Sequence, residues 1–470
     1  MKKIVIAFIA AVIILPLLYV FFARPSQPAQ EPAPVPETLR PVLAAADKGD
    51  VQSQYIIGKA YFYGGQGLHK NFDKGLYYMK KAAAVGGADA LYELALAYKY
   101  GKGAPMDYNA ALDNFKKAAE GGSSASMLEI ARIYDEAKQS AAREWFEKAA
   151  NAGEAEAIKK MADISCSVPK PAKDCAAWLQ KAADINSVEH IKQLAKIYED
   201  GVIAPQSKKD ALSLYVKAAE LGDVSSMSAA GYSYTTGSLA PRDNKLAYEW
   251  TLKAAQGGNV ESMYNLALML YDGKIVVQDK DAALAWFIKA AQSGNNQAAY
   301  RAGLMYAEKQ NFKDAAPLLT QAARAQIQGA AGSLAKAMLA VQNYKDALEW
   351  ANKGVKTNDA NAMAVLGYLY ANGLGIDQDT QQCLNWYGQA MKADPQNGTY
   401  MYNIANCFAR QGEYDKSVYW LKQAAEHGSK TAMFKLAELY REGRGVKKDE
   451  KLAAQWGTSA AAAKDDEWAL

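Results

Sequence analysis

The chain has few of the residues from which catalytic and metal sites are built. Its 470 residues include only three histidines and four cysteines. His69, His190 and His427 lie far apart, and no cysteine and histidine spacing resembles a metal site. The sequence also lacks a phosphate-binding glycine loop, a dinucleotide-binding glycine motif and a nucleophile elbow. We therefore expect a protein that is not an enzyme and uses no cofactor or metal.

An excess of one charge is also missing. The 54 lysines and arginines nearly balance the 50 aspartates and glutamates, which leaves a formal net charge of +4. So small an excess on a chain of this length does not create the positive field that nucleic-acid binding requires. We expect no nucleic-acid partner.

Charge is absent from residues 4–23, which follow two lysines at the N-terminus. As a helix this segment would be roughly 30 Å long, about the thickness of a hydrocarbon core. A phenylalanine occupies the position where a signal-peptide cleavage site needs a small residue, and no cysteine precedes Cys166 to permit lipoprotein processing. We predict that residues 1–23 form an uncleaved transmembrane signal anchor, with cleavage as the alternative.

The charges that flank this segment predict its orientation. Two lysines and the amino terminus precede it, whereas Arg24 alone follows directly, so the N-terminus should be cytoplasmic. The rest of the chain would then lie outside the inner membrane, in a bacterial periplasm. Residues 24–41 contain six prolines and are predicted to be an extended linker. In polyproline II conformation it would reach about 50 Å.

Beyond the linker the chain repeats a pattern of two amphipathic helices and a turn, seen clearly in residues 258–294. In the first helix Met263 and Leu266 belong to a set at helical spacing that shares one face. The second helix starts near Asp279 and ends before Gly294. Such a hairpin has apolar surface on more than one side, so it needs copies of itself stacked against it.

The sequence contains twelve copies, at intervals of 31 to 36 residues. Each second helix ends in a K-A-A signature or its equivalent. The opening residue of that signature is Lys81, Lys117, Lys148, Lys181, Lys217, Lys253, Lys289, Gln321, Lys353, Gln389, Gln423 and Ser459.

One first-helix position is glycine or alanine in all twelve copies. These residues are Gly58, Ala95, Ala131, Ala162, Ala195, Gly231, Ala267, Gly303, Ala335, Gly367, Ala405 and Ala437. A position that is always this small predicts a close approach between two helices.

Individual repeats carry a family resemblance. Residues 432–445, AMFKLAELYREGRG, resemble the first helix and turn of Sel1-like repeats, whose second helix ends K-A-A-x-x-G. Shorter copies such as residues 403–423, with the compact turn RQGEYDKS, resemble tetratricopeptide repeats. The resemblance implies an all-α fold, a right-handed α-solenoid superhelix of about twelve antiparallel helix pairs. It would cover residues 42–464, and residues 465–470 would be a tail.

The resemblance also implies a non-enzymatic scaffold that binds an envelope protein or peptide in a concave groove lined by first helices. We expect two first-helix positions to face that groove, three residues before the small residue and one residue after it. Our candidate groove residues at these positions are Tyr55, Tyr92, Lys159, Lys192, Tyr232, Tyr264, Tyr300, Tyr368, Tyr402 and Phe434. Exposed aromatic rows favour binding, but the same tyrosines could pack against neighbouring hairpins, and both interpretations stay open.

Two other functions are compatible with the sequence. Paired tyrosines such as Tyr264 and Tyr300 could stack on sugar rings, which would make the chain a glycan-binding module that assists polysaccharide secretion or cell-wall enzymes. A remote alternative is the cysteine-rich group of Sel1-like proteins described as β-lactamases. Those proteins pair cysteines in nearly every repeat, whereas this chain has four cysteines in all.

The four cysteines are consistent with an oxidising compartment. Cys166 and Cys175 flank the turn of the fourth repeat, and Cys383 and Cys407 lie in the tenth and eleventh repeats. We predict that each cysteine pairs with its near neighbour, which is one of three possible connectivities. Four buried thiols are the alternative, because cysteine often behaves as a small hydrophobic residue.

Overall fold

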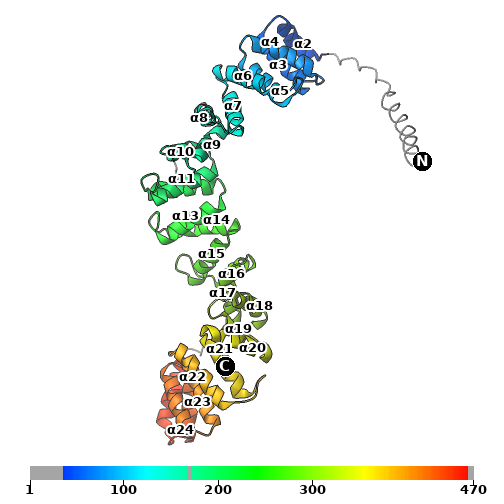
Figure 1. Cartoon of the computed structure of the whole chain (residues 1–470). Coiled ribbons are helices and arrows are strands. Elements are labelled where there is room, and N and C mark those ends of the chain that lie inside the picture. Colours follow the sequence, from blue (N-terminus) through cyan, green and yellow to red (C-terminus); the bar gives the residue numbers. More distant parts are fainter. Residues whose placement is uncertain (1–34, 168–171, 464–470) are drawn as a thin grey trace, which may run out of the picture. The chain divides into compact units, whose positions relative to one another are not determined.

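The computed structural model describes residues 35–167 and 172–463, and this part of the chain contains α-helices and two short 3-10 helices (Figure 1). The chain divides into two compact units, unit 1 up to Pro205 and unit 2 from Gln206. The helices of unit 1 are η1 (Glu37–Leu39), α2 (Arg40–Asp47), α3 (Val51–Tyr63), α4 (Phe72–Ala84), α5 (Ala88–Tyr100), α6 (Tyr108–Glu120), α7 (Ser124–Glu136), α8 (Ala141–Asn151), α9 (Ala155–Ser165), α10 (Cys175–Asp184) and α11 (Val188–Asp200).

Unit 2 continues the same alternation of first and second helices. Its helices are α12 (Lys208–Glu220), α13 (Val224–Thr236), α14 (Asn244–Gln256), α15 (Val260–Asp272), α16 (Lys280–Gln292), α17 (Asn296–Glu308), α18 (Phe312–Arg324), α19 (Ala330–Ala340), α20 (Tyr344–Gly354), η2 (Val355–Thr357), α21 (Ala360–Asn372), α22 (Thr380–Ala393), α23 (Gly398–Arg410), α24 (Tyr414–Glu426), α25 (Lys430–Glu442) and α26 (Glu450–Ala462).

Local sequence signals set the ends of these helices. Asp279 caps the start of α16, where its carboxylate accepts a hydrogen bond from the backbone N–H of Ala282 at 2.9 Å. Gly273 ends α15 in the left-handed conformation, with φ of 69°. The same caps recur along the chain, which explains why one hairpin is rebuilt many times.

Within each unit, every helix packs against the helix before it and the helix after it in the sequence. One core cluster in unit 2 runs without interruption from Ala255 in α14 to Ala337 in α19. The predicted all-α solenoid of about twelve helix pairs is confirmed, because first and second helices alternate in the sequence from α3 to α26. The right-handed superhelix stays a prediction.

The small first-helix residues lie where the two helices of a hairpin touch, as the sequence predicts. A methyl group added to Gly303 in α17 would lie 2.7 Å from Cγ of Leu319 in α18. At Gly231 in α13 it would lie 2.6 Å from the hydroxyl oxygen of Thr251 in α14. The alanines at this position are buried, for example Ala267 with 0% exposure. Only a small side chain allows this approach.

The beginning of the solenoid differs from the prediction. Helical structure starts at Glu37 rather than near residue 42, and Leu39 is buried in a cluster with Ala46 and Ile57. The predicted linker therefore ends earlier than residue 41, because an apolar residue within it contributes to the core.

The predicted transmembrane anchor, residues 1–23, and the first part of the linker lie outside the described residues, as do residues 465–470. No helix within the described ranges has the length and apolar character needed to cross a membrane.

Candidate functional site: the first-helix surface

Most of the predicted groove tyrosines are half-buried against their own hairpins. The ring of Tyr92 in α5 lies 5.8 Å from that of Phe115 in α6, and Tyr264 in α15 lies 5.7 Å from Phe287 in α16. Both distances are typical of aromatic pairs in protein cores. These contacts show that the tyrosines pack onto the second helix while part of each side chain stays accessible.

Other predicted groove residues contact further elements. The hydroxyl of Tyr300 in α17 lies 3.5 Å from that of Ser333 in α19, the next first helix. Tyr55 accepts a hydrogen bond from Lys59 one turn later in α3, at 3.1 Å. Tyr368 and Tyr402 are half-buried against clusters of their own repeats.

Three of the ten predicted residues are well exposed: Lys159 in α9, Tyr232 in α13 and Phe434 in α25. Tyr232 exposes 61% of its surface and Phe434 50%. Lys192 in α11 is half-buried. The ten residues are spread over both units and do not form a single cluster. Their role in a groove stays a prediction.

A row of charged and polar side chains, four of them buried, joins successive first helices of unit 1, and the sequence did not predict it. Glu93 in α5 is 6% exposed. Its carboxylate accepts a hydrogen bond from the hydroxyl of Tyr63 in α3 at 2.5 Å and lies 3.4 Å from the ammonium of Lys59. Burial and the hydrogen bond to Glu93 raise the pKa of Tyr63 above its ordinary value. The first two repeats are therefore linked through one carboxylate.

The same arrangement recurs one repeat later. Lys99 in α5 donates a hydrogen bond at 2.8 Å to the carboxylate of Glu129 in α7, and both side chains are buried. Burial alone would lower the pKa of Lys99, but the hydrogen bond and charge of Glu129 outweigh it and raise the pKa. Arg132 also binds Glu129, so this buried carboxylate has two cationic partners.

Arg132 extends the row to the next repeat. Its guanidinium forms two hydrogen bonds with the carboxylate of Glu156 in α9, at 3.1 and 2.5 Å. The hydrogen bond from Arg132 lowers the pKa of Glu156 below its usual value. Lys160 in α9 pairs with Asp135 in α7 at 3.0 Å.

The last step of the row joins α9 to α11. Nε2 of His190 lies 3.3 Å from the carboxylate of Asp163, and Nδ1 lies 2.7 Å from the hydroxyl of Ser187. We call the connected residues the ionic ladder: Lys59, Tyr63, Glu93, Lys99, Glu129, Arg132, Asp135, Glu156, Lys160, Asp163 and His190. Sequence alone gave a weak signal for it, since partners on different helices lie 24 to 34 residues apart.

Both predicted cysteine pairs are bonded in the structure. Cys166 and Cys175 bracket the turn between α9 and α10, with Cα atoms 4.8 Å apart. Cys383 in α22 bonds to Cys407 in α23 across two repeats, with Cα atoms 6.3 Å apart. Both separations lie in the range found for disulfides. Residues 168–171 of the first turn lie outside the described part of the chain.

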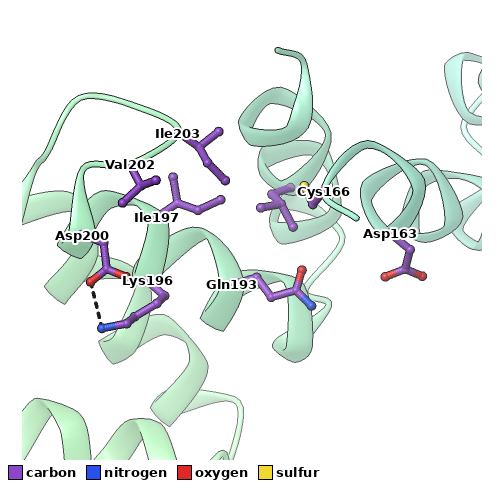
Figure 2. Close-up of a pocket in the computed structure, with 9 residues that line it drawn as sticks. Asp163, Cys166, Gln193, Lys196, Ile197, Asp200, Val202 and Ile203 are labelled. Atoms are coloured by element: carbon purple, nitrogen blue, oxygen red, sulfur yellow. Dashed lines mark ion pairs between the residues drawn. The ribbon is translucent and has the colours of Figure 1, made fainter. Parts of the chain in front are cut away.

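A cavity of about 450 Å³ opens beside the first disulfide, between α9, α10 and α11 (Figure 2). Its volume is within the range of known ligand pockets. The residues that line it are Asp163, Cys166, Leu179, Gln193, Lys196, Ile197, Asp200, Val202 and Ile203. Figure 2 shows Val202 and Ile203 grouped with Ile197, across the opening from the disulfide.

The local sequence explains why a cavity forms in this repeat. Elsewhere the loop after a first helix packs on the start of the preceding second helix: Gly103 lies against Phe72 of α4 and Gly375 against Tyr344 of α20. In the fifth repeat Ile203 occupies the position of those glycines. The preceding helix, α10, has 10 residues instead of the 13 of α4 and begins at the disulfide. The loop therefore faces a shortened helix.

A second-helix motif, a lysine that lies over a tryptophan ring, was also not predicted from the sequence. Lysines of the K-A-A signature lie over the tryptophan ring three residues earlier, at distances from 4.0 to 4.4 Å between the ammonium nitrogen and the ring centre. The pairs are Trp145 with Lys148, Trp178 with Lys181, Trp250 with Lys253, Trp286 with Lys289, and Trp350 with Lys353. The tryptophans are buried or half-buried, which indicates a packing role.

Comparison with known proteins agrees with this architecture. The Sel1 repeat model matches residues 51–86, 88–123, 135–154, 168–187, 192–223, 224–259, 260–295, 360–395, 399–429 and 430–465, more than half of the chain. The gap from 296 to 359 coincides with α17 to α20, where the turns within hairpins are short. None of the curated proteins compared with the chain matches it.

Solved structures with similar folds include other repeat proteins. The protective antigen c5321 of uropathogenic Escherichia coli, which displays an SLR fold, is 26% identical, with 90% of this chain and 79% of that chain covered and a TM-score of 0.31. A Sel1 repeat protein from Oxalobacter formigenes is 22% identical, with 80% and 96% covered and a TM-score of 0.41. On the family match, the chain belongs to the Sel1 repeat family, within the TPR-like superfamily of helical repeat proteins.

Proposed function

We propose that this protein is a non-enzymatic scaffold that binds an envelope protein, or a peptide segment of one, on its first-helix surface. The observation that carries the proposal is the set of exposed aromatic residues on first helices. Tyr63 and Tyr100 end α3 and α5 in adjacent repeats and expose 50% and 55% of their surfaces. Tyrosine provides a large contact area at low entropic cost and is enriched at protein interfaces.

The architecture supports the same function. Repeats stacked in sequence order present their first helices side by side, which creates an extended surface for a protein or peptide. Sel1 and TPR-like repeat proteins typically act as protein-interaction scaffolds and are generally not enzymes. The partner's identity is not part of the proposal.

We further propose that the scaffold is tethered to the bacterial inner membrane through residues 4–23, with its repeats in the periplasm. The uncharged segment and the preceding lysines support the tether and its orientation. The bonds Cys166–Cys175 and Cys383–Cys407 support an oxidising compartment.

A glycan is the second candidate ligand. Tyr63 and Tyr100 are equivalent residues of adjacent repeats, and their exposed rings could stack on neighbouring sugars. The pair named from the sequence, Tyr264 and Tyr300, is half-buried. Tyr264 packs on Phe287, which leaves less of the ring for a sugar. We therefore rank a protein partner above a glycan.

The test is crosslinking of the full-length protein in its own membranes, followed by mass spectrometry of the captured material. We expect a defined envelope protein, and we expect Tyr100→Ala in α5 to reduce its recovery at least tenfold, as for an interface hot spot. The matched control is Tyr108→Ala in α6, since Tyr108 is 52% exposed but lies on a second helix. Capture of glycan without protein would contradict the proposal, and so would an equal loss of partner recovery with Tyr100→Ala and Tyr108→Ala.

A further inference from the structure

We propose that the cavity between α9 and α11 binds a partner peptide in which an aliphatic side chain and a cationic one are adjacent. This inference rests on the proposed scaffold function and specifies the chemistry of the segment that the scaffold recognises. It concerns the cavity lined by Asp163, Leu179, Lys196, Asp200 and Ile203 with their neighbours.

The apolar part of the cavity explains the aliphatic side chain. Leu179 of α10 lines the cavity and is fully buried, with 0% exposure. Val202 and Ile203 in the loop after α11 expose 82% and 36% of their surfaces. Exposed aliphatic residues beside a cavity are stabilised when a ligand covers them, by roughly 25 cal/mol for each Å² of apolar surface removed from water. An aliphatic side chain matches this lining in polarity.

The apolar residues are exposed because the neighbouring helix is short. In the sixth repeat the equivalent loop residue, Leu239, is 9% exposed, whereas Ile203 is 36% exposed. The difference follows from α10, which starts only at Cys175. Part of the Ile203 side chain is therefore accessible to a ligand, whereas the equivalent surface of Leu239 is buried by packing.

The charges of the cavity explain the cationic residue. Its lining contains the carboxylates of Asp163 and Asp200 but only one ammonium, that of Lys196. Lys196 lies 2.9 Å from Asp200 (Figure 2) and 3.3 Å from Glu199, so one ammonium is shared by two carboxylates and the negative charge remains in excess. The side chain of Asp163 is 60% exposed and contacts His190 at one oxygen. A cationic side chain beside the aliphatic one would complement this negative charge.

A pair of fluorescein-labelled hexapeptides tests the inference on the full-length protein in mild detergent. The peptides, Ser-Gly-Leu-Lys-Gly-Ser and Ser-Gly-Leu-Glu-Gly-Ser, differ only in the charge after leucine. We expect fluorescence polarisation at low salt to show about fivefold tighter binding of the lysine peptide, as for an accessible ion pair. Asp163→Asn should remove this preference, whereas Asp272→Asn, at the position in α15 that corresponds to Asp200 in α11, should preserve it.

The apolar contact is tested separately. Ile203→Ser should weaken binding of both peptides about tenfold, and Val85→Ser, an exposed substitution at the end of α4, should leave it unchanged. Circular dichroism of each variant establishes that it is folded. Equal affinity for the two peptides, or binding that does not respond to Ile203→Ser in a folded variant, would overturn the inference.

The two proposals fail in different ways. If crosslinking captures an envelope protein but Asp163→Asn and Ile203→Ser leave its recovery unchanged, the scaffold function stands and the cavity is not its peptide site. If crosslinking captures no protein while the lysine peptide still binds through Asp163 and Ile203, the cavity binds peptides and the scaffold proposal fails.

Discussion

The two units share one repeat pattern but join successive first helices by different chemistry. In unit 1 the ionic ladder places charged groups between them, including the buried Lys99 and Glu129, which are 2.8 Å apart. In unit 2 hydroxyl and amide groups make several of the corresponding contacts, and the charged groups Arg410 and Asp359 meet neutral partners, namely Ala371 and Asn372 for Arg410 and the backbone N–H of Gly332 for Asp359. Ser262 in α15 donates a hydrogen bond to Ser228 in α13 at 2.9 Å, and Tyr400 in α23 donates one to Asn361 in α21 at 3.4 Å.

This difference shows that the structure of the hairpin does not determine which side-chain contacts join it to the neighbouring hairpins. Apolar packing within and between hairpins is common to both units, as the clusters around Leu94 in unit 1 and Leu334 in unit 2 show. Where charges are buried, the stability of the folded state depends on each charged partner, because a buried ion without a counter-charge is strongly destabilising. Neutral hydrogen bonds carry a smaller penalty when one partner is removed. Unit 1 should therefore be the more sensitive unit to loss of one inter-repeat group.

The largest effect should come from Glu129→Ala. Lys99 would remain buried without its carboxylate partner, which should destabilise this part of unit 1 by about 3 to 5 kcal/mol. The matching change in unit 2, Ser262→Ala, should cost about 1 kcal/mol because it removes one neutral hydrogen bond. Hydrogen exchange of the amides in α5 and α7, compared with α13 and α15, measures both effects.

A double variant controls for lost volume and lost packing. Lys99→Met combined with Glu129→Leu replaces both charges by apolar side chains of similar size, and it should restore most of the stability lost in Glu129→Ala. Two results would contradict the contrast between the units. One is a double variant that is as unstable as Glu129→Ala, and the other is a loss of stability in Ser262→Ala as large as that in Glu129→Ala.

The next effect concerns a feature that both units share, the close approach within a hairpin. Gly303→Leu should push α17 away from Leu319 in α18, where even a methyl group would lie at 2.7 Å, at a cost of about 1 to 3 kcal/mol or more. Because repeats depend mainly on their neighbours, faster amide exchange should appear around α17 and α18 first.

Gly388 in α22 provides the matched control, since a methyl group there would meet no atom within 4 Å. Gly388→Ala should be neutral or stabilise the protein by up to about 1 kcal/mol, because alanine favours helix more than glycine. Uniform loss of protection along the whole solenoid in Gly303→Leu would contradict segment-wise stability.

The smallest effect is a pH dependence in unit 1. Arg132 lowers the pKa of Glu156 in the folded protein. The resulting stability is present above the unfolded-state pKa, about 4.3, and is lost as the pH falls through the lower folded-state value. The side chain of Glu156 is 56% exposed, so the pair should contribute only about 0.2 to 1 kcal/mol.

Glu156→Gln makes this contribution measurable. The variant should be slightly less stable than the parent protein at pH 7, and the difference in stability should close as the pH falls through the lowered folded-state pKa of Glu156. Chemical denaturation followed by circular dichroism, or exchange of α7 and α9 amides, reports the difference. A gap that widens on acidification would show that the sign assigned to this ion pair is wrong.

Much of the fold follows from local sequence. Helical spacing of Met263 and Leu266, the cap at Asp279 and the left-handed Gly273 are properties of short segments, and they define the hairpin. The small residue of each first helix predicted a close helix contact because steric limits act at one position. The start of the solenoid was less predictable, since the burial of Leu39 depends on Ile57, in a different helix.

The candidate site was predictable only in part. The sequence identified the first-helix positions of Tyr92 and Tyr264, but their exposure depends on Phe115 and Phe287 in the second helices. The cavity beside the fourth repeat was missed, although the cysteine-bracketed turn marked that repeat as unusual. A clue was available in Ile203, which occupies the position of Gly103 and Gly375 in two other repeats.

Periodicity, caps and residue size act over a few helical turns, so local sequence is enough to define the repeat, its twelve copies and the close contact of the two helices in a hairpin. Which charges meet between repeats, and where a cavity remains, depends on the tertiary structure. The pairing of Lys99 with Glu129 depends on how one hairpin is rotated against the next. That rotation is set by the summed packing of many side chains, which no local pattern in the sequence encodes.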